Sequence, residues 1–118
     1  MKPLALIIED NQDQNLVFTT ALNQAGFETE SILDGATAQL RLTEVVPEVV
    51  VLDLHIPDVN GEILLRQIRS DKRLAKVRVM LATADASLAK DLQSQADIVL
   101  LKPISFSQLS KLAIRLAA

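Results

Sequence analysis

The sequence predicts an α/β domain in which a parallel sheet lies between two layers of helices. Short apolar runs alternate five times with segments whose apolar residues recur at helical spacing, and this alternation is typical of parallel strands joined by right-handed crossovers. Residues 49–52 (VVVL) form an unbroken aliphatic run, as expected for a strand that is buried on both faces. The 118 residues are enough for one domain with a substantial core.

The same pattern predicts the individual elements. The expected strands cover residues 4–8, 27–32, 49–52, 77–82 and 98–101. The first helix should end near Ala25 because Gly26 follows it, and the second should open at Asp34-Gly35 and end before Pro47. The other helices are expected at 61–70, 87–96 and 105–117. Three helices have these expected inward faces: Ala36, Leu40 and Thr43; Leu88, Leu92 and Ala96; and Phe106, Leu109, Ala113 and Leu116.

Polar residues follow four of the five expected strands. With five strand–helix repeats, the flavodoxin-like (βα)5 arrangement with strand order 2-1-3-4-5 is the natural choice. In that order the first and third strands are neighbours, followed by the fourth and the fifth. Their carboxyl ends carry Glu9 and Asp10, Asp53, Thr83 and Lys102. Because ligands of open α/β sheets bind at these strand ends, we expect the five side chains to form one site.

This combination of side chains predicts phosphoryl chemistry. Three carboxylates at close range repel one another, and a hard divalent cation with oxygen ligands, best Mg²⁺, relieves that repulsion. Lys102 would add a positive charge for a phosphate oxygen, and the Thr83 hydroxyl would add a hydrogen-bond donor. A carboxylate nucleophile, Asp53, beside a metal, a lysine and a hydroxyl forms a phosphoryl-acceptor site.

Composition excludes several other classes. The net charge of −3, with acids and bases interspersed, indicates no basic surface for direct nucleic-acid binding and no polybasic membrane anchor. The chain has no cysteine, and its one histidine is too few for a His-based zinc site. No apolar run is long enough to cross a membrane, so we expect a cytoplasmic domain.

Four segments together resemble the receiver domain of two-component response regulators, of the chemotaxis CheY type, over essentially the whole chain, 1–118. They are Glu9-Asp10, residues 53–61 (DLHIPDVNG), Thr83-Ala84 and Lys102-Pro103, each at the end of an expected strand and in the family's order. Each segment is common by itself, but the four in these positions are specific. The resemblance also implies a cis Lys102–Pro103 bond.

The resemblance assigns a role to each site residue. It implies that Asp53 accepts a phosphoryl group from a histidine kinase or a phosphotransfer protein. Asp10 and Asp53 would hold Mg²⁺, with Glu9 acting mainly through water and the His55 main-chain carbonyl as a further ligand. Lys102 would bind the acceptor carboxylate or the phosphoryl group, and Thr83 would turn inward to meet that group.

As a member of this family, the chain would be a signalling domain rather than an enzyme in the usual sense, although it would promote its own aspartyl phosphorylation and dephosphorylation. Its conformational switch would control a partner or a covalently attached output domain, and a second copy of the chain is a further candidate partner. The family often has Tyr or Phe three residues before the lysine, whereas this chain has Val99. We therefore expect the switch to reorganise residues 83–92 and to leave Val99 almost unchanged.

Other functions remain as alternatives. One is a receiver-like interaction module that no longer depends on phosphorylation; Val99 favours it, whereas the complete acid set with Lys102 opposes it. Another is a metal-dependent phosphatase with an aspartyl nucleophile, which would need a second acid two residues after Asp53, where His55 stands. A flavin site is disfavoured because the aromatic residues that would stack on the ring are missing. The chain is either a stand-alone regulator or a domain of a longer protein, and we favour the second.

Overall fold

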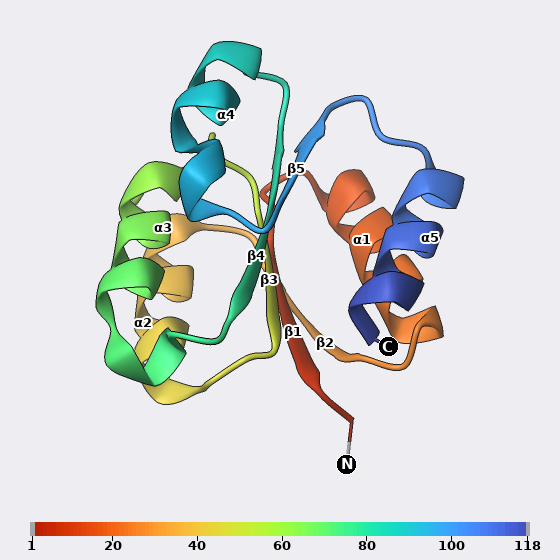
Figure 1. Cartoon of the computed structure of the whole chain (residues 1–118), viewed down its shortest axis with the longest axis horizontal. Helices are drawn as coiled ribbons and strands as arrows, with labels where there is room; N and C mark the ends of the chain where they lie inside the picture. Colours follow the sequence, from red (N-terminus) through yellow and green to blue (C-terminus); the bar gives the residue numbers. More distant parts are fainter. Residues whose placement is uncertain (1, 118) are drawn as a thin grey trace.

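In the computed structural model, which describes residues 2–117, all the predicted strands and helices appear in the predicted order (Figure 1). The elements are β1 (Leu4–Ile8), α1 (Gln12–Gln24), β2 (Glu28–Ile32), α2 (Gly35–Glu44), β3 (Val49–Leu52), α3 (Gly61–Ser70), β4 (Arg78–Thr83), α4 (Ala86–Leu92), β5 (Ile98–Leu101) and α5 (Phe106–Ala117). Two short 3-10 turns, η1 (Lys72–Leu74) and η2 (Gln93–Gln95), precede β4 and β5. The five strands are parallel and lie in the order β2-β1-β3-β4-β5, which confirms the flavodoxin-like prediction.

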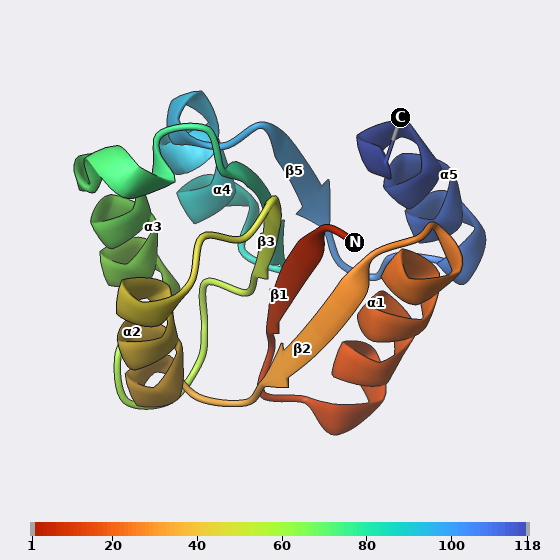
Figure 2. The ribbon, with the colours of Figure 1, turned by 90° about the horizontal axis from the view of Figure 1, so that it is seen from below.

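The sheet separates two helical layers. Helices α1 and α5 cover one face, and α2, α3 and α4 cover the other (Figures 1 and 2). Successive residues of β1 alternate between the two layers: Ala5 and Ile7 pack with residues of α1 and α5, whereas Leu6 and Ile8 pack with residues of α2 and α3. Both faces of the central strands are therefore apolar, which explains the unbroken aliphatic run of β3.

The helices that follow β1 to β4 each begin with a side-chain cap. Asn11, Asp34, Asn60 and Asp85 each use a side-chain oxygen to accept a hydrogen bond from the main-chain N–H three residues further on. Such a cap typically contributes about 1 kcal/mol to helix stability. These polar loop residues therefore have a structural role that is independent of any site chemistry.

Two glycines are required by the backbone. Gly26 has φ of 107° directly after α1 and its C-cap residue, which confirms the predicted end of that helix. At Gly61, a Cβ atom would lie 2.5 Å from the Asp53 carbonyl oxygen and 2.5 Å from the Leu54 Cα. Only glycine lets the first turn of α3 approach the main chain of Asp53 so closely.

Three predicted details of the helices are wrong. Helix α2 buries Gly35, Ala38 and Leu42 rather than Ala36, Leu40 and Thr43, and Leu40 is 62% exposed. A Cβ atom on Gly35 would lie 1.9 Å from the Val59 carbonyl oxygen, so this close contact fixes which face of α2 turns inward.

The other two differences concern helix ends. Phe106, expected in the core, is 42% exposed because it is the first residue of α5, where the apolar stripe reaches the surface. Helix α4 ends at Leu92 and continues as η2, and Ala96 is already extended, with φ of −114° and ψ of 155°. None of the helices within residues 2–117 is long and apolar enough to cross a membrane.

Candidate functional site

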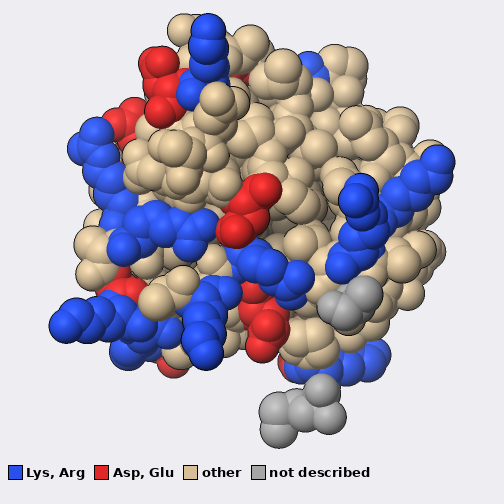
Figure 3. All heavy atoms as spheres, in the orientation of Figure 1, with Lys and Arg blue, Asp and Glu red and all other residues tan. Residues whose placement is uncertain are grey.

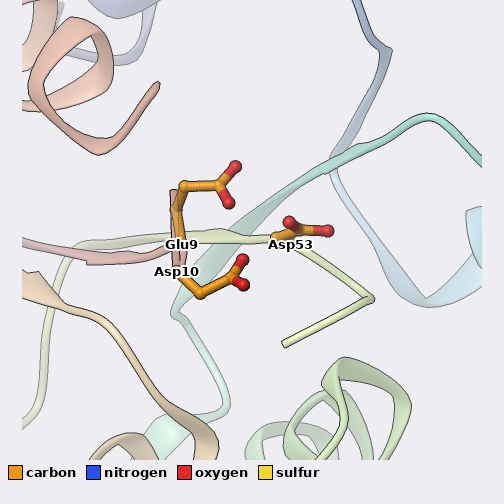
Figure 4. Close-up of side chains that lie close together, drawn as sticks. All are labelled: Glu9, Asp10 and Asp53. Atoms are coloured by element: carbon orange, nitrogen blue, oxygen red, sulfur yellow. The ribbon is translucent and has the colours of Figure 1, made fainter. Parts of the chain in front are cut away.

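Three carboxylates meet at the carboxyl ends of β1 and β3. The pairing of Ile8 with Leu52 places the next residues of both strands at the same level, and the Asp53 N–H donates to the Ile8 carbonyl at 3.0 Å. One carboxylate oxygen from each of Glu9, Asp10 and Asp53 lies within 4.8 Å of the others. Figure 4 shows the Glu9 and Asp10 side chains extending from the end of β1 toward Asp53. This convergence confirms that the three carboxylates meet, as expected from the strand order.

Lys102 closes the site from the end of β5. Its Nζ donates to a carboxylate oxygen of Glu9 and, at 3.2 Å, to Asp53 Oδ2. Its main-chain N–H donates to the Thr83 carbonyl at 2.9 Å, which ties β5 to the end of β4. The Lys102–Pro103 peptide bond is cis, as predicted. Through its contacts with the Glu9 and Asp53 carboxylates, Lys102 neutralises part of the negative charge of the site.

Burial changes the proton affinity of these groups. Glu9 is 1% exposed, and its desolvation, with a smaller contribution from the neighbouring Asp53, outweighs Lys102 and raises the pKa of Glu9 from 4.5 to about 7. Desolvation acts to lower the pKa of Lys102, but the bonds to Glu9 and Asp53 outweigh it, so the lysine pKa is raised. Lys102 thus remains charged, whereas Glu9 is close to titration near neutral pH.

Both oxygens of Asp53 have hydrogen-bond partners. Oδ1 accepts from the main-chain N–H of His55 at 3.0 Å, and Oδ2 accepts from Lys102. The residue is 7% exposed. Its orientation is therefore determined by the main chain of the β3–α3 loop on one side and by the β5–α5 loop on the other.

Thr83 and His55 belong to a second group of contacts beside the acids. Thr83 is fully buried, and its hydroxyl accepts from the Asp85 N–H at 3.1 Å rather than contacting the carboxylates. Asp85 caps α4 through Leu88, and its Oδ2 lies 3.2 Å from Nε2 of the exposed His55 ring. The cap and then His55 lower the pKa of Asp85. The β4–α4 loop is thereby joined to the β3–α3 loop across the site.

Asn15 is a site-supporting residue that the sequence reasoning missed. It lies in α1, is 2% exposed, and its Nδ2 donates to the carbonyls of Ile7, Glu9 and Ile32 at 3.2, 3.0 and 3.4 Å. A signal was present in the sequence, because Asn15 stands three residues before the inward-facing Phe18 and so on the same side of the helix. A polar residue on an inward face indicates buried hydrogen bonding.

The charges are distributed unevenly between the two ends of the sheet. Six of the twelve Lys and Arg residues lie within residues 66–78, which run from α3 into β4 at the amino ends of the strands. Figure 3 shows basic side chains gathered at the lower left of the face in view. The loops that follow the strands contain only one base, Lys102, and these six acids: Glu9, Asp10, Asp34, Asp53, Asp58 and Asp85. The site therefore lies on the negative end of the domain.

The donor set fits a hard divalent cation. Carboxylate oxygens are the ligands that Mg²⁺ prefers, and two or three of them with water complete its usual shell. Glu9, Asp10 and Asp53 supply such oxygens within reach of a single ion. A cation here would relieve the mutual repulsion of the three acids, and Lys102 would be available to interact with another anionic group.

Comparison with known proteins agrees with this geometry. The model of the response regulator receiver domain family matches residues 5–114. The chain is 30% identical over 112 residues to the phosphate regulon transcriptional regulatory protein PhoB of Rhizobium meliloti (strain 1021), covering 92% of this chain and 49% of PhoB. It thus spans about half the length of this curated relative.

Solved structures share the fold. The chemotaxis response regulator CheY4 of Vibrio cholerae superposes with a TM-score of 0.87 at 19% identity, covering 98% of this chain and 99% of CheY4. The receiver domain of the sensor histidine kinase PA1611 from Pseudomonas aeruginosa PAO1, solved with a magnesium ion coordinated in its active site cleft, gives 0.85 at 22% identity, covering 99% and 98% of the two chains. The fold, the strand-end acids and the family match lead to one conclusion: the chain belongs to the response regulator receiver domains and acts as a receiver in two-component signalling.

Proposed function

We propose that this receiver domain accepts a phosphoryl group on Asp53 from a histidine kinase or a phosphotransfer protein in the presence of Mg²⁺. The observation that carries the proposal is the cluster of Glu9, Asp10 and Asp53 with Lys102 bonded to two of its members. The switch that follows would control a partner or a covalently attached output domain, in the cytoplasm.

Each residue has a distinct part in the proposed chemistry. A carboxylate oxygen of Asp53 attacks the phosphorus of a phosphohistidine; the P–O bond forms as the P–N bond breaks, and the electron pair returns to the imidazole nitrogen. Asp10, Asp53 and the His55 main-chain carbonyl would hold Mg²⁺, with Glu9 acting mainly through water. When bound, Mg²⁺ neutralises negative charge on the phosphoryl oxygens.

Lys102 and Thr83 respond to the new group. Lys102 holds Asp53 Oδ2 at 3.2 Å, so its charge is already beside the position where phosphoryl oxygens arrive. Thr83 would turn its hydroxyl away from the Asp85 N–H, from which it accepts, and donate a hydrogen bond to a phosphoryl oxygen. Because Asp85 also caps α4 and pairs with His55, this exchange would alter the start of α4.

The test is phosphorylation by a small donor. Incubation with acetyl phosphate and Mg²⁺ should give a hydroxylamine-labile mass increase, which should disappear in Asp53→Asn. Asp58→Asn is a matched control, because Asp58 is an exposed acid of the same loop and its φ of 71° suits asparagine. Equal labelling of Asp53→Asn would refute the assignment of the acceptor. Absence of labelling in the wild type would favour an interaction module that does not depend on phosphorylation.

A further inference from the structure

We infer that Asn15 is a positioning residue for the acidic cluster: its side-chain amide holds the main chain of Glu9 and thereby sets the position of the Asp10 carboxylate. The inference rests on the proposed function, since it concerns how the same acids bind Mg²⁺. It assigns a role to a residue of α1 that lies outside the strand-end loops.

The amide of Asn15 joins the ends of two strands. Its two amide hydrogens are shared among three carbonyls, those of Ile7 and Glu9 at the end of β1 and that of Ile32 at the end of β2. The Ser31 hydroxyl donates to Asn15 Oδ1, so both ends of the buried amide are satisfied. An amide with this number of partners has one orientation available to it.

A closed circuit of hydrogen bonds surrounds Asp10. The Asn11 N–H donates to Glu9 Oε2 at 3.3 Å, the Asn15 N–H donates to the Asn11 carbonyl at 2.8 Å, and Asn15 Nδ2 donates to the Glu9 carbonyl at 3.0 Å. The Glu9 N–H also donates to the Ile32 carbonyl at 3.0 Å. The residues on either side of Asp10 are therefore both fixed.

Asp10 depends on this circuit more than its two neighbours in the cluster do. Glu9 and Asp53 are held directly by Lys102, whereas Asp10 is exposed and its carboxylate makes no hydrogen bond or ion pair within residues 2–117. Its position follows from the main chain that carries it. Mg²⁺ tolerates little departure from octahedral geometry, and changes to residues that orient metal ligands typically reduce affinity by about 10- to 100-fold.

The test compares Asn15→Leu with Leu22→Val, which alters a buried residue of the same helix outside the circuit. Mg²⁺ affinity is measured by NMR titration, and the rate of labelling by acetyl phosphate is measured as a function of Mg²⁺ concentration. We expect Asn15→Leu to raise the Kd for Mg²⁺ by about 10-fold or more. The labelling rate at saturating Mg²⁺ should stay within about 3-fold of wild type, because Asp53 and Lys102 keep their own contacts.

A purely structural role predicts another pattern. In that case Asn15→Leu and Leu22→Val would both lower the melting temperature and leave the Kd for Mg²⁺ unchanged, which would overturn the inference. If Asn15→Leu does not fold, Asn15→Ser takes its place, since a hydroxyl has one hydrogen to donate where the amide has two. A wild-type protein that neither binds Mg²⁺ nor becomes labelled would refute the proposed function itself, whereas normal wild-type behaviour with unaffected Asn15 variants would refute only the role of Asn15.

Discussion

Glu9→Gln should change how the stability of the metal-free protein depends on pH. Burial raises the pKa of Glu9 from 4.5 to about 7, so between these values the folded state holds a proton that the unfolded state has released. The stability associated with protonated Glu9 is thus fully present below pH 4.5 and is lost as the pH rises toward 7. At about 1.4 kcal/mol per pH unit, this interval corresponds to a loss of about 3 kcal/mol. The amide in the Glu9→Gln variant does not titrate, so the variant would not show the loss.

The assay is urea unfolding followed by circular dichroism, with EDTA present, from pH 4.5 to 8. The unfolding free energy of wild type minus that of Glu9→Gln should decrease by about 3 kcal/mol over this range, and the melting temperature of wild type should fall by roughly 10 °C relative to that of the variant. Glu28→Gln, at an exposed position of β2, controls for the loss of one carboxylate. A difference between wild type and Glu9→Gln that is the same at every pH would refute the reasoning.

Three further predictions concern the metal and the switch. A bound Mg²⁺ would favour the ionised form of Glu9, so Mg²⁺ affinity should rise by up to about 10-fold per pH unit as the pH approaches 7 and level off above it. Calorimetry should detect proton release on binding. Asp10→Asn should raise the melting temperature of the metal-free protein, because it removes one of three clustered negative charges. The same substitution should weaken Mg²⁺ binding, and an unchanged Mg²⁺ titration would count against Asp10 as a ligand. Beryllofluoride with Mg²⁺, as a substitute for the phosphoryl group, should change NMR signals and amide exchange mainly in residues 83–92. The amides of α4 should exchange faster than those of α1, α3 and α5. A largest change at Val99 and α5 would contradict this account of the switch.

The sheet and the acidic cluster were predictable because they depend on which strands are neighbours and on which residues follow each strand. Once β1 and β3 are neighbours, the residues that follow them must meet, whatever the helices do. The run at residues 49–52 specified a strand buried on both faces, and Gly26 marked the end of α1. These features are encoded by a few adjacent residues.

The helix details depended on contacts between distant segments. The rotation of α2 is set by the close contact of Gly35 with Val59, whereas the helical spacing of Ala36, Leu40 and Thr43 had suggested a different inward face. The hydrogen bonds of Asn15 reach residues up to 17 positions away and require the folded β1–β2 pair. The bond between Thr83 and Asp85 joins residues only two positions apart, but it depends on the conformation that the β4–α4 loop adopts in the fold. The spacing of apolar residues along the sequence does not reveal such contacts.

The uneven placement of charge gives the domain an electric dipole whose negative pole is the carboxyl edge of the sheet, where the loops contain six acids and one lysine. A partner with a basic docking surface would be oriented before contact, so that its phosphohistidine faces Asp53 rather than the basic segment at 66–78. A higher ionic strength should therefore slow the encounter with such a partner. The transfer step inside the docked complex should be much less affected, because salt screens desolvated groups poorly. Small anionic phosphoryl donors would be repelled by the same field, so it would favour phosphorylation of Asp53 by a basic protein partner over phosphorylation by free anionic metabolites.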